Sequence, residues 1–303
     1  MKNNLSKGKI IKVRDLNIGD GRPLLIAGPC SIESRDHIIK EAKSLKKMGV
    51  DILRGGAFKP RTSPYDFQGL GFKGVEYLKE ASEKTSLPIV TEVLSEDHVD
   101  MMKDYVDIFQ IGSRNMYNYS LLKKVGKTKK PVILKRGFSA TLREWEMAAK
   151  YIELAGNENI IFCERGIRTF ETETRNTLDL AGAYILKEKT SYPVIVDPSH
   201  GTGKRELIEP MVKASLALDF DGVMIEVHPN PDDSKSDAAQ TIDYETYEKI
   251  SNYVRDFYEN RIWRWIFFWK RCFRNNKSCR WKTSIFKRTY RKTWKKFKIF
   301  WNK

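Results

Sequence analysis

The chain has 303 residues, and its 41% hydrophobic and 31% charged side chains are typical of a protein with a large buried core. Its formal net charge of +16 comes entirely from residues 261–303, which hold 16 Lys or Arg and no Asp or Glu, whereas the first 260 residues contain 39 acidic and 39 basic side chains. The first 260 residues therefore give no electrostatic reason to expect nucleic-acid binding.

The first 22 residues are polar and contain one short strand-like run, Lys9–Val13, before a turn at Gly19–Gly21. They predict a short N-terminal strand or hairpin that caps a larger domain. From Pro23 onward, short apolar runs alternate with amphipathic helical stretches. The predicted strands are Leu24–Ala27, Ile52–Arg54, Ile89–Val93, Ile108–Ile111, Val132–Lys135, Ile160–Cys163, Val194–Val196 and Val223–Val227. The predicted helices lie around His37–Met48, Gly74–Thr85, Glu96–Tyr105, Tyr119–Val125, Thr141–Leu154, Asn176–Lys187, Glu206–Ala217 and Tyr244–Phe257.

This alternation predicts an α/β fold. Eight strand–helix units match a (β/α)₈ TIM barrel in number and length, and we assign the barrel to residues 23–258. A doubly wound open sheet has the same alternation and is the alternative. The eight regular units favour the barrel.

Chemically functional residues follow every predicted strand. They are Cys30; Arg54 and Lys59; Glu92; Arg114; Lys135; Glu164 and Arg165; Asp197 and His200; and Glu226 and His228. In a parallel barrel the carboxyl ends of all the strands meet at one face, where the loops build active sites. The sequence therefore predicts a ligand-binding face at that end.

The stretch 52–63, ILRGGAFKPRTS, concentrates positive charge after the second predicted strand, and Gly55 and Gly56 allow close approach of a ligand. Seven cations are expected to converge on the face: Arg54, Lys59, Arg61, Arg114, Lys135, Arg165 and Arg168. Their mutual repulsion requires a polyanionic ligand, so we expect two phosphorylated substrates, or one phosphate and a carboxylate. We also expect one or two of these cations to form ion pairs with Glu92 or Glu164.

A second group at this face consists of Cys30, His200, Glu226 and Asp237. A thiolate, an imidazole and two carboxylates can hold a divalent transition metal such as Mn, Fe, Co or Zn. From the residues alone, a buried cysteine that binds nothing is the competing interpretation. Residues that could take a place among the four are Glu92, His228, Asp232 and Asp233.

Several long motifs resemble one enzyme family. They are AGPCSIES (27–34), LRGGAFKPRTSPYDFQGLG (53–71), TEV (91–93), QIGSRNMYN (110–118), ILKRG (133–137), CERGIRTFE (163–171), VDPSHGTGKR (196–205) and IEVHPNPDDSKSDAAQ (225–240). Over about residues 9–257 the chain resembles the 3-deoxy-7-phosphoheptulonate (DAHP) synthases, and it is most similar to their short, beta-type branch. The sister family, the 3-deoxy-octulosonate 8-phosphate synthases, typically has a KANRS-like motif where this chain has KPRT. This difference favours erythrose 4-phosphate over arabinose 5-phosphate as the second substrate.

The resemblance implies a metal-dependent transferase of the shikimate pathway, which leads to chorismate and the aromatic amino acids. Such an enzyme condenses phosphoenolpyruvate with erythrose 4-phosphate and releases phosphate. The implied ligands of the divalent metal are Cys30, His200, Glu226 and Asp237. Phosphoenolpyruvate is expected at Arg54, Lys59, Arg114, Lys135 and Arg165, and erythrose 4-phosphate at Arg61, Thr62 and Asn115. The expected catalytic residues are Lys135 as proton donor, Lys59, and Glu92, which orients water.

The cellular setting is expected to be the cytoplasm. The four cysteines, Cys30, Cys163, Cys272 and Cys279, are too few and too scattered for a disulfide scaffold and fit a reducing compartment. We recognise no signal peptide, and no run approaches the roughly 20 apolar residues of a membrane span. We expect the barrel to bind neither nucleic acid nor membrane, and to form a homodimer or homotetramer as barrels of this family do.

Residues 259–303 lie outside the resemblance and form a basic, aromatic tail. From residue 261 onward they hold six of the seven tryptophans and no Gly, Pro or Ala. We interpret the tail as the product of out-of-frame reading of A/T-rich coding DNA, and we expect no folded domain there. The alternative is an arm that binds nucleic acid or anionic membranes.

Overall fold

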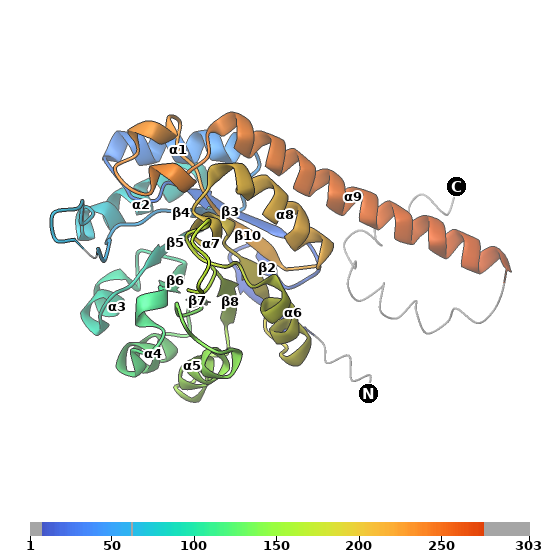
Figure 1. Ribbon diagram of the computed structural model, residues 1–303, viewed down its shortest axis with the longest axis horizontal. Helices are drawn as coiled ribbons and strands as arrows, with labels where there is room; N and C mark the ends of the chain where they lie inside the picture. The colour runs from blue at the N-terminus through green and yellow to red at the C-terminus, as the bar shows by residue number, and fades with distance from the viewer. Residues whose placement is uncertain (1–7, 62, 276–303) are drawn as a thin grey trace.

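The protein is described by a computed structural model, which covers residues 8–61 and 63–275, with side chains described as far as residue 261. Eight parallel strands close into a barrel in the order β10-β3-β4-β5-β6-β7-β8-β9, and the helices surround it (Figure 1). The predicted (β/α)₈ barrel is confirmed, and the alternative of a doubly wound open sheet is wrong.

The observed elements follow the predicted alternation. The barrel strands are β3 (Leu24–Gly28), β4 (Ile52–Arg54), β5 (Ile89–Glu92), β6 (Ile108–Ile111), β7 (Val132–Lys135), β8 (Ile160–Glu164), β9 (Val194–Val196) and β10 (Gly222–Glu226). The helices are α1 (Arg35–Lys47), α2 (Phe72–Thr85), α3 (Glu96–Met102), α4 (Tyr119–Gly126), α5 (Leu142–Leu154), α6 (Leu180–Lys189), α7 (Pro198–Thr202), α8 (Ile208–Ala217) and α9 (Tyr244–Asn275).

The inside of the barrel is a packed apolar core. The strands are short runs buried on both faces, as parallel strands covered by helices must be. Their interior side chains form a cluster of Leu24, Ile26, Ile52, Val90, Ile108, Ile133, Ile161, Cys163, Ile195 and Met224. A second, larger cluster fills the space between the strands and the helices.

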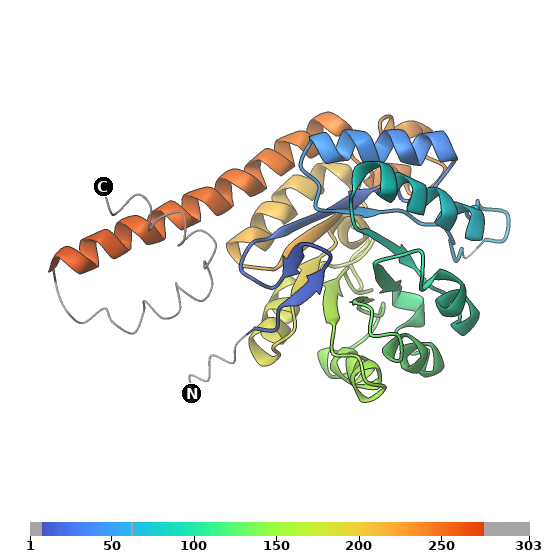
Figure 2. The same cartoon turned by 180° about the vertical axis from the view of Figure 1, so that it is seen from behind.

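An N-terminal hairpin, β1 (Ile11–Val13) and β2 (Leu16–Ile18), packs against the interior cluster and caps the amino end of the barrel (Figure 2). The guanidinium of Arg14 fixes it by bonding the carboxylate of Asp107, directly before β6. The predicted hairpin is present, and so is the predicted turn at Gly19–Gly21. The hairpin itself turns after Val13, where Arg14 takes a positive φ and leads into a second strand that was not predicted.

Two differences from the predicted helices concern the loops that carry the site. Helix α6 begins at Leu180 and not near Asn176, because the Asp179 side chain caps it by accepting from Gly182 N. The short helix α7 was not predicted. It begins where the Asp197 side chain accepts from His200 N, and this contact turns His200 back toward the barrel axis.

Helix α9 runs unbroken to Asn275, beyond its predicted end near Phe257, and projects away from the barrel (Figure 1). The boundary predicted at residue 258 therefore falls within a helix, and the division into domains stays a prediction. Residues 276–303 of the predicted tail lie outside the described residues. Among the described helices, none combines the length and the apolar character that a bilayer span needs.

Candidate active site

A cavity of about 270 Å³ opens at the carboxyl end of the barrel. Its charged and titratable lining residues are Arg54, Lys59, Arg61, Asp66, Glu92, Arg114, Lys135, Arg165, Arg175, His200 and Asp237. Residues that follow different strands therefore meet at one face, as predicted, and cations outnumber carboxylates in the lining.

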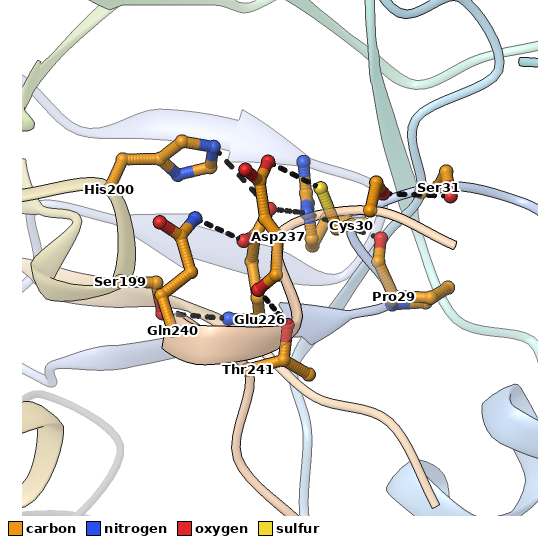
Figure 3. Close-up of polar contacts among 12 residues, drawn as sticks. Pro29, Cys30, Ser31, Ser199, His200, Glu226, Asp237, Gln240 and Thr241 are labelled. Carbon is orange, nitrogen blue, oxygen red and sulfur yellow. Dashed lines mark hydrogen bonds and ion pairs between the residues drawn. The ribbon is translucent and has the colours of Figure 1, made fainter. Parts of the chain in front are cut away.

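Three of the four predicted metal ligands form a tight group at this cavity. The Sγ atom of Cys30 and carboxylate oxygens of Glu226 and Asp237 all lie within 4.8 Å of one another (Figure 3). Cys30 follows β3, and Glu226 ends β10, which pairs with β3 in parallel. Asp237 reaches the group from the loop after β10, where its Oδ2 accepts from the Cys30 thiol at 3.0 Å.

The fourth predicted ligand, His200, reaches the same group from α7. Its Nε2 lies 3.4 Å from Glu226 Oε1, and its Nδ1 lies 2.8 Å from Asp197 Oδ2. Burial favours a neutral imidazole with a single proton, and the shorter contact, to the acceptor-only carboxylate of Asp197, places that proton on Nδ1 and leaves Nε2 free to bind a metal. A carboxylate behind an imidazole is the usual arrangement that orients a metal-binding histidine.

The electrostatics of the group favour ionised carboxylates and a protonated thiol. Burial opposes the ionisation of Glu226, but His200 and Arg54 outweigh it and lower the pKa of Glu226 to about 2. Burial, reinforced by Glu226, raises the pKa of the Cys30 thiol to about 12. Burial also lowers the pKa of His200 and so favours its neutral form. A metal ion that binds the sulfur therefore has to displace the thiol proton.

Two cations hold this group in place. Arg54 Nη1 donates to Glu226 Oε1 at 2.6 Å, and both side chains are buried. Lys59 Nζ donates to Cys30 Sγ at 2.9 Å and to the Cys30 carbonyl at 3.1 Å. Gly56 permits this approach, because a Cβ there would lie 2.4 Å from the Cys30 carbonyl oxygen and 2.8 Å from Lys59 Cδ.

The group fits a divalent transition metal ion by its donor set and by its orientation. A thiol, an imidazole nitrogen with a free lone pair and two ionised carboxylates suit Mn, Fe, Co or Zn. Gln240 Nε2 donates to Glu226 Oε2 at 2.5 Å, and this bond orients the carboxylate so that Oε1 faces His200. These residues could therefore hold the metal that the sequence predicted.

Another part of the cavity gathers positive charge on one aromatic ring. The guanidinium carbons of Arg114, Arg165 and Arg168 lie 5.4, 4.8 and 4.7 Å from the ring centroid of Phe138. Among the described side chains, no carboxylate lies within 4.0 Å of these three guanidinium groups. The ring thus holds cations whose charge is available to an anionic ligand.

The expected ion pairs with Glu92 or Glu164 are wrong. In the described part of the chain, Glu164 pairs with Arg136 at 2.9 Å, and Glu92 accepts a hydrogen bond from Gln110 at 3.2 Å. The predicted site cations pair with other acids: Arg54 with Glu226, Lys135 with Asp197 at 2.6 Å, and Arg61 with Asp237 at 3.7 Å.

Two predicted residues, Asn115 and Arg168, lie outside the cavity lining. Asn115 lies in a 3-10 turn after β6 and accepts a hydrogen bond from Asn118, and it is not part of the cavity lining. Arg168 stacks on Phe138 outside that lining. Thr62 lies outside the described residues.

Three residues with roles in the site were not named from the sequence: Phe138, Arg175 and Gln240. Asp197 was named only as a residue at a strand end and was given no role. Asp197 joins His200 to Lys135, and its place at a strand end was a usable signal. Arg175 Nη1 donates to Asp237 Oδ1 at 3.1 Å and to Gln240 Oε1 at 2.7 Å. These contacts join loops distant in sequence, so no local pattern indicates them.

Known proteins resemble the chain in both sequence and fold. A family model described as the DAHP synthetase I family matches residues 5–260. Over 241 residues the chain is 48% identical to phospho-2-dehydro-3-deoxyheptonate aldolase from Thermotoga maritima, a match that covers 80% of this chain and 71% of that protein. Over 248 residues it is 31% identical to 2-dehydro-3-deoxyphosphooctonate aldolase from Francisella tularensis subsp. holarctica, with 75% and 88% covered.

Solved structures give the same result. A crystal structure of the Thermotoga maritima DAHP synthase matches with a TM-score of 0.81 at 46% identity and covers 84% of this chain and 74% of that one. A truncated form of 3-deoxy-D-arabino-heptulosonate 7-phosphate synthase from the same organism matches with a TM-score of 0.78 at 42% identity, with 84% and 93% covered.

Proposed function

The chain belongs to the DAHP synthetase I family and acts as an enzyme of 3-deoxy-7-phosphoheptulonate synthesis, and on this premise we propose that the cavity at the carboxyl end of its barrel is the active site. The reaction joins C3 of phosphoenolpyruvate to the aldehyde carbon of erythrose 4-phosphate. Water adds at C2 of the former phosphoenolpyruvate, and inorganic phosphate leaves. This is the first step of the shikimate pathway.

The observation that carries this proposal is the division of the cavity. One part holds the group of Cys30, His200, Glu226 and Asp237, and another holds the guanidinium groups stacked on Phe138. An aldehyde needs a polarising group at its oxygen, and a phosphate needs cations, so this division suits a reaction between a carbonyl compound and a phosphate ester.

The cationic part suits phosphoenolpyruvate. We assign this substrate to Arg54, Lys59, Arg114, Lys135 and Arg165, all of which line the cavity. Arg114 and Arg165 can bind phosphate oxygens in a bidentate manner, and lysine adds a point charge. The same cations stabilise the negative charge of phosphate as it leaves.

The second substrate is assigned to the loop after β4. Arg61 lines the cavity close to Asp237, and together with Thr62 and Asn115 it is the proposed binding site for erythrose 4-phosphate. The sugar phosphate would then lie at the rim, with its aldehyde directed inward toward Cys30. This arrangement holds the two reacting carbons side by side and converts a bimolecular reaction into a local one.

The four ligand residues would hold the divalent metal ion, and a bound metal supplies Lewis-acid polarisation of a carbonyl oxygen. The neighbouring protein groups prepare that site. Asp197 holds the His200 tautomer, Gln240 orients Glu226, and the Lys59 ammonium stabilises negative charge on the Cys30 sulfur.

Proton transfer is assigned to Lys135 and Glu92. Lys135 Nζ lies 2.6 Å from Asp197 Oδ2, which holds the ammonium at the cavity, where it can donate a proton to the intermediate. Glu92 lines the cavity and can accept a hydrogen bond from the water that adds at C2. Residue 112 has to be glycine for Glu92 to take this position, because a Cβ at Gly112 would lie 2.0 Å from Glu92 Oε1.

The test is phosphate release from phosphoenolpyruvate by the full chain, with erythrose 4-phosphate or arabinose 5-phosphate, each with and without a chelator. We expect chelator-sensitive release with the four-carbon sugar alone. Turnover with the five-carbon sugar would support the alternative, 3-deoxy-octulosonate 8-phosphate synthesis. Absence of turnover with either sugar after metal is restored would contradict the proposal and leave binding through residues 259–303 as the remaining candidate.

The setting of the enzyme is part of the proposal. Cys30 and Cys163 are buried and are not bonded to each other, which suits the reducing cytoplasm and keeps the Cys30 sulfur available to a metal. A homodimer or homotetramer remains the expected assembly, and light scattering of the purified chain would measure it.

A further inference from the structure

A second group of potential metal ligands comes from the loop after β3, the first turn of α1 and the loop after β10, close to Cys30 and Asp237 in the chain. Glu33 and His37 follow Cys30 at the start of α1, and His228 precedes Asp237 after β10. The two loops are joined by a hydrogen bond of 2.9 Å between the Ser31 and Ser236 hydroxyl groups. One ligand atom each of Glu33, His37 and His228 lies within 4.8 Å of the others.

Three ring nitrogens of this group, two from His37 and one from His228, are buried without hydrogen-bond partners among the described residues. The His228 side chain is 6% exposed, and its Nε2 has no hydrogen-bond partner among the described residues. Neither ring nitrogen of His37 has such a partner within the described part of the chain. The two rings lie 4.8 Å apart, and His228 Nε2 is 3.8 Å from Glu33 Oε1. Buried polar atoms normally have partners, so these unpartnered nitrogens are available to a ligand that contacts them directly.

The other ring nitrogen of His228, Nδ1, contacts the backbone of Asn230. It lies 2.5 Å from the Asn230 carbonyl oxygen and 3.1 Å from the Asn230 amide nitrogen. A zinc ion bound at Nε2 would leave the imidazole proton on Nδ1, where the Asn230 carbonyl oxygen can accept it. A backbone carbonyl behind an imidazole is a common way of orienting a histidine that binds a metal.

Polar groups also surround the other two side chains. Glu33 Oε1 accepts from the Lys235 amide at 2.9 Å and has further lone pairs free. Glu41 Oε2 lies 3.7 Å from His37 Nε2 and accepts from the Tyr244 hydroxyl at 2.9 Å. Glu41 therefore borders the His37 ring at a distance longer than a hydrogen bond.

We propose that Glu33, His37 and His228 bind a zinc ion at a second site, distinct from the predicted catalytic metal site. Two imidazoles and one carboxylate are ligands that zinc prefers, with a fourth position left for water. Bonds of about 2.0–2.1 Å require the three side chains to close in by about an ångström. The ion would tie the loop after β3 to the loop after β10 and so stabilise the two segments that hold Cys30 and Asp237.

The test counts zinc on the full chain after chelation and equilibrium dialysis against micromolar zinc. The variant is His37→Gln, which removes one imidazole and keeps a similar volume. The matched control is His98→Gln, because His98 stacks on Phe58 and belongs to neither group. We expect His37→Gln to bind one zinc per chain fewer than the parent, and His98→Gln to bind the same number as the parent. The parent and both variants contain Cys272 and Cys279, so any zinc bound by these cysteines cancels. The difference in zinc count between the parent and His37→Gln therefore reports on the proposed second site.

A second measurement follows the stabilisation. Zinc should raise the Tm of Cys30→Ala, in which the first site is disrupted, and it should raise the Tm less in Cys30→Ala/His37→Gln. Glu33→Gln, at the partly exposed start of α1, serves as a further variant if His37→Gln does not fold, and it should weaken zinc binding at least tenfold. The proposal would be overturned if His37→Gln bound as much zinc as the parent. The same holds for Glu33→Gln if it has to take the place of His37→Gln. Equal zinc-induced shifts in Tm would also overturn the proposal.

Discussion

The two ends of the barrel are built from the same eight strands but carry opposite chemistry. At the amino end the hairpin inserts Ile11, Val13 and Ile18 into an apolar cluster. At the carboxyl end the strands lead into buried ions such as Arg54, Glu226, Lys135 and Asp197. The apolar end gains free energy from burial, whereas the polar end loses desolvation energy that ion pairing only partly restores.

This difference separates stability from activity along the barrel axis. Substitutions at the amino end should lower the free energy of unfolding and leave catalysis intact. Substitutions at the carboxyl end should impair catalysis and leave the free energy of unfolding largely unchanged. Substitutions at the two ends test this division.

The largest loss of turnover is expected from substitution of Cys30, and a second buried cysteine, Cys163, provides the control. Cys30→Ala removes a proposed metal ligand, and turnover should fall by about 10³-fold or more, which corresponds to about 4 kcal/mol of transition-state stabilisation. Cys163→Ala, its matched control, lies in the interior cluster and should keep its turnover while losing about 1–2 kcal/mol of stability. Steady-state assays with added metal measure the first effect, and full activity in Cys30→Ala would refute its assignment as a ligand.

A smaller effect is expected at the aromatic ring that carries the cations. Arg165→Lys keeps the charge but loses the bidentate geometry, so kcat/KM for phosphoenolpyruvate should fall by about 10²-fold. Arg168→Lys changes a guanidinium on the same ring outside the cavity lining and should lose less than tenfold. Equal losses of kcat/KM in the two variants would contradict the assignment of Arg165 as the arginine that binds substrate and of Arg168 as one that does not.

The amino end is tested by Ile18→Ala, which truncates a fully buried side chain of the hairpin. It should cost about 2–4 kcal/mol in the free energy of unfolding, with kcat unchanged at a temperature where the chain stays folded. Ile10→Ala, at a neighbouring residue that is 55% exposed, is the control and should cost little. Denaturant unfolding measures the difference, and a large loss of kcat in Ile18→Ala would contradict the proposed division.

The smallest effect concerns pH. Burial raises the pKa of Glu41 to about 8, although the Tyr244 hydroxyl donates to it. The folded chain therefore retains a proton that the unfolded chain releases above its ordinary pKa of 4.5, and stability should fall as pH rises from about 5 to about 8. Glu41→Gln cannot titrate, so its Tm in the presence of a chelator should exceed that of the parent by a few degrees more at pH 9 than at pH 5. A difference that does not change with pH would contradict the raised pKa.

Much of this architecture could be predicted, because barrel strands are short, continuous apolar runs bounded by polar loops. Cys30, Glu226 and the other strand-end residues follow from the same pattern, since a parallel barrel brings all these ends together. Their roles as ligands came from the resemblance to a family and not from spacing, which left His228 and Glu92 as alternatives.

What could not be predicted depends on contacts between distant loops. Phe138 gathers arginines from the loops after β6 and β8, and neither helical nor strand periodicity constrains such an arrangement. Helix α7 is too short to show a periodic pattern, although Asp197 followed by Pro198 is a usable start signal. The strand Leu16–Ile18 has three residues and gains its stability from the barrel it caps.

The most direct test of the central claim is a diffraction experiment on crystals of the full chain grown with manganese and phosphoenolpyruvate. At a wavelength where manganese scatters anomalously, we predict an anomalous peak bounded by the side chains of Cys30, His200, Glu226 and Asp237. Phosphate density should lie beside Arg114 and Arg165. Manganese bound elsewhere, or phosphoenolpyruvate bound away from these arginines, would contradict the assignment of the carboxyl end as the active site.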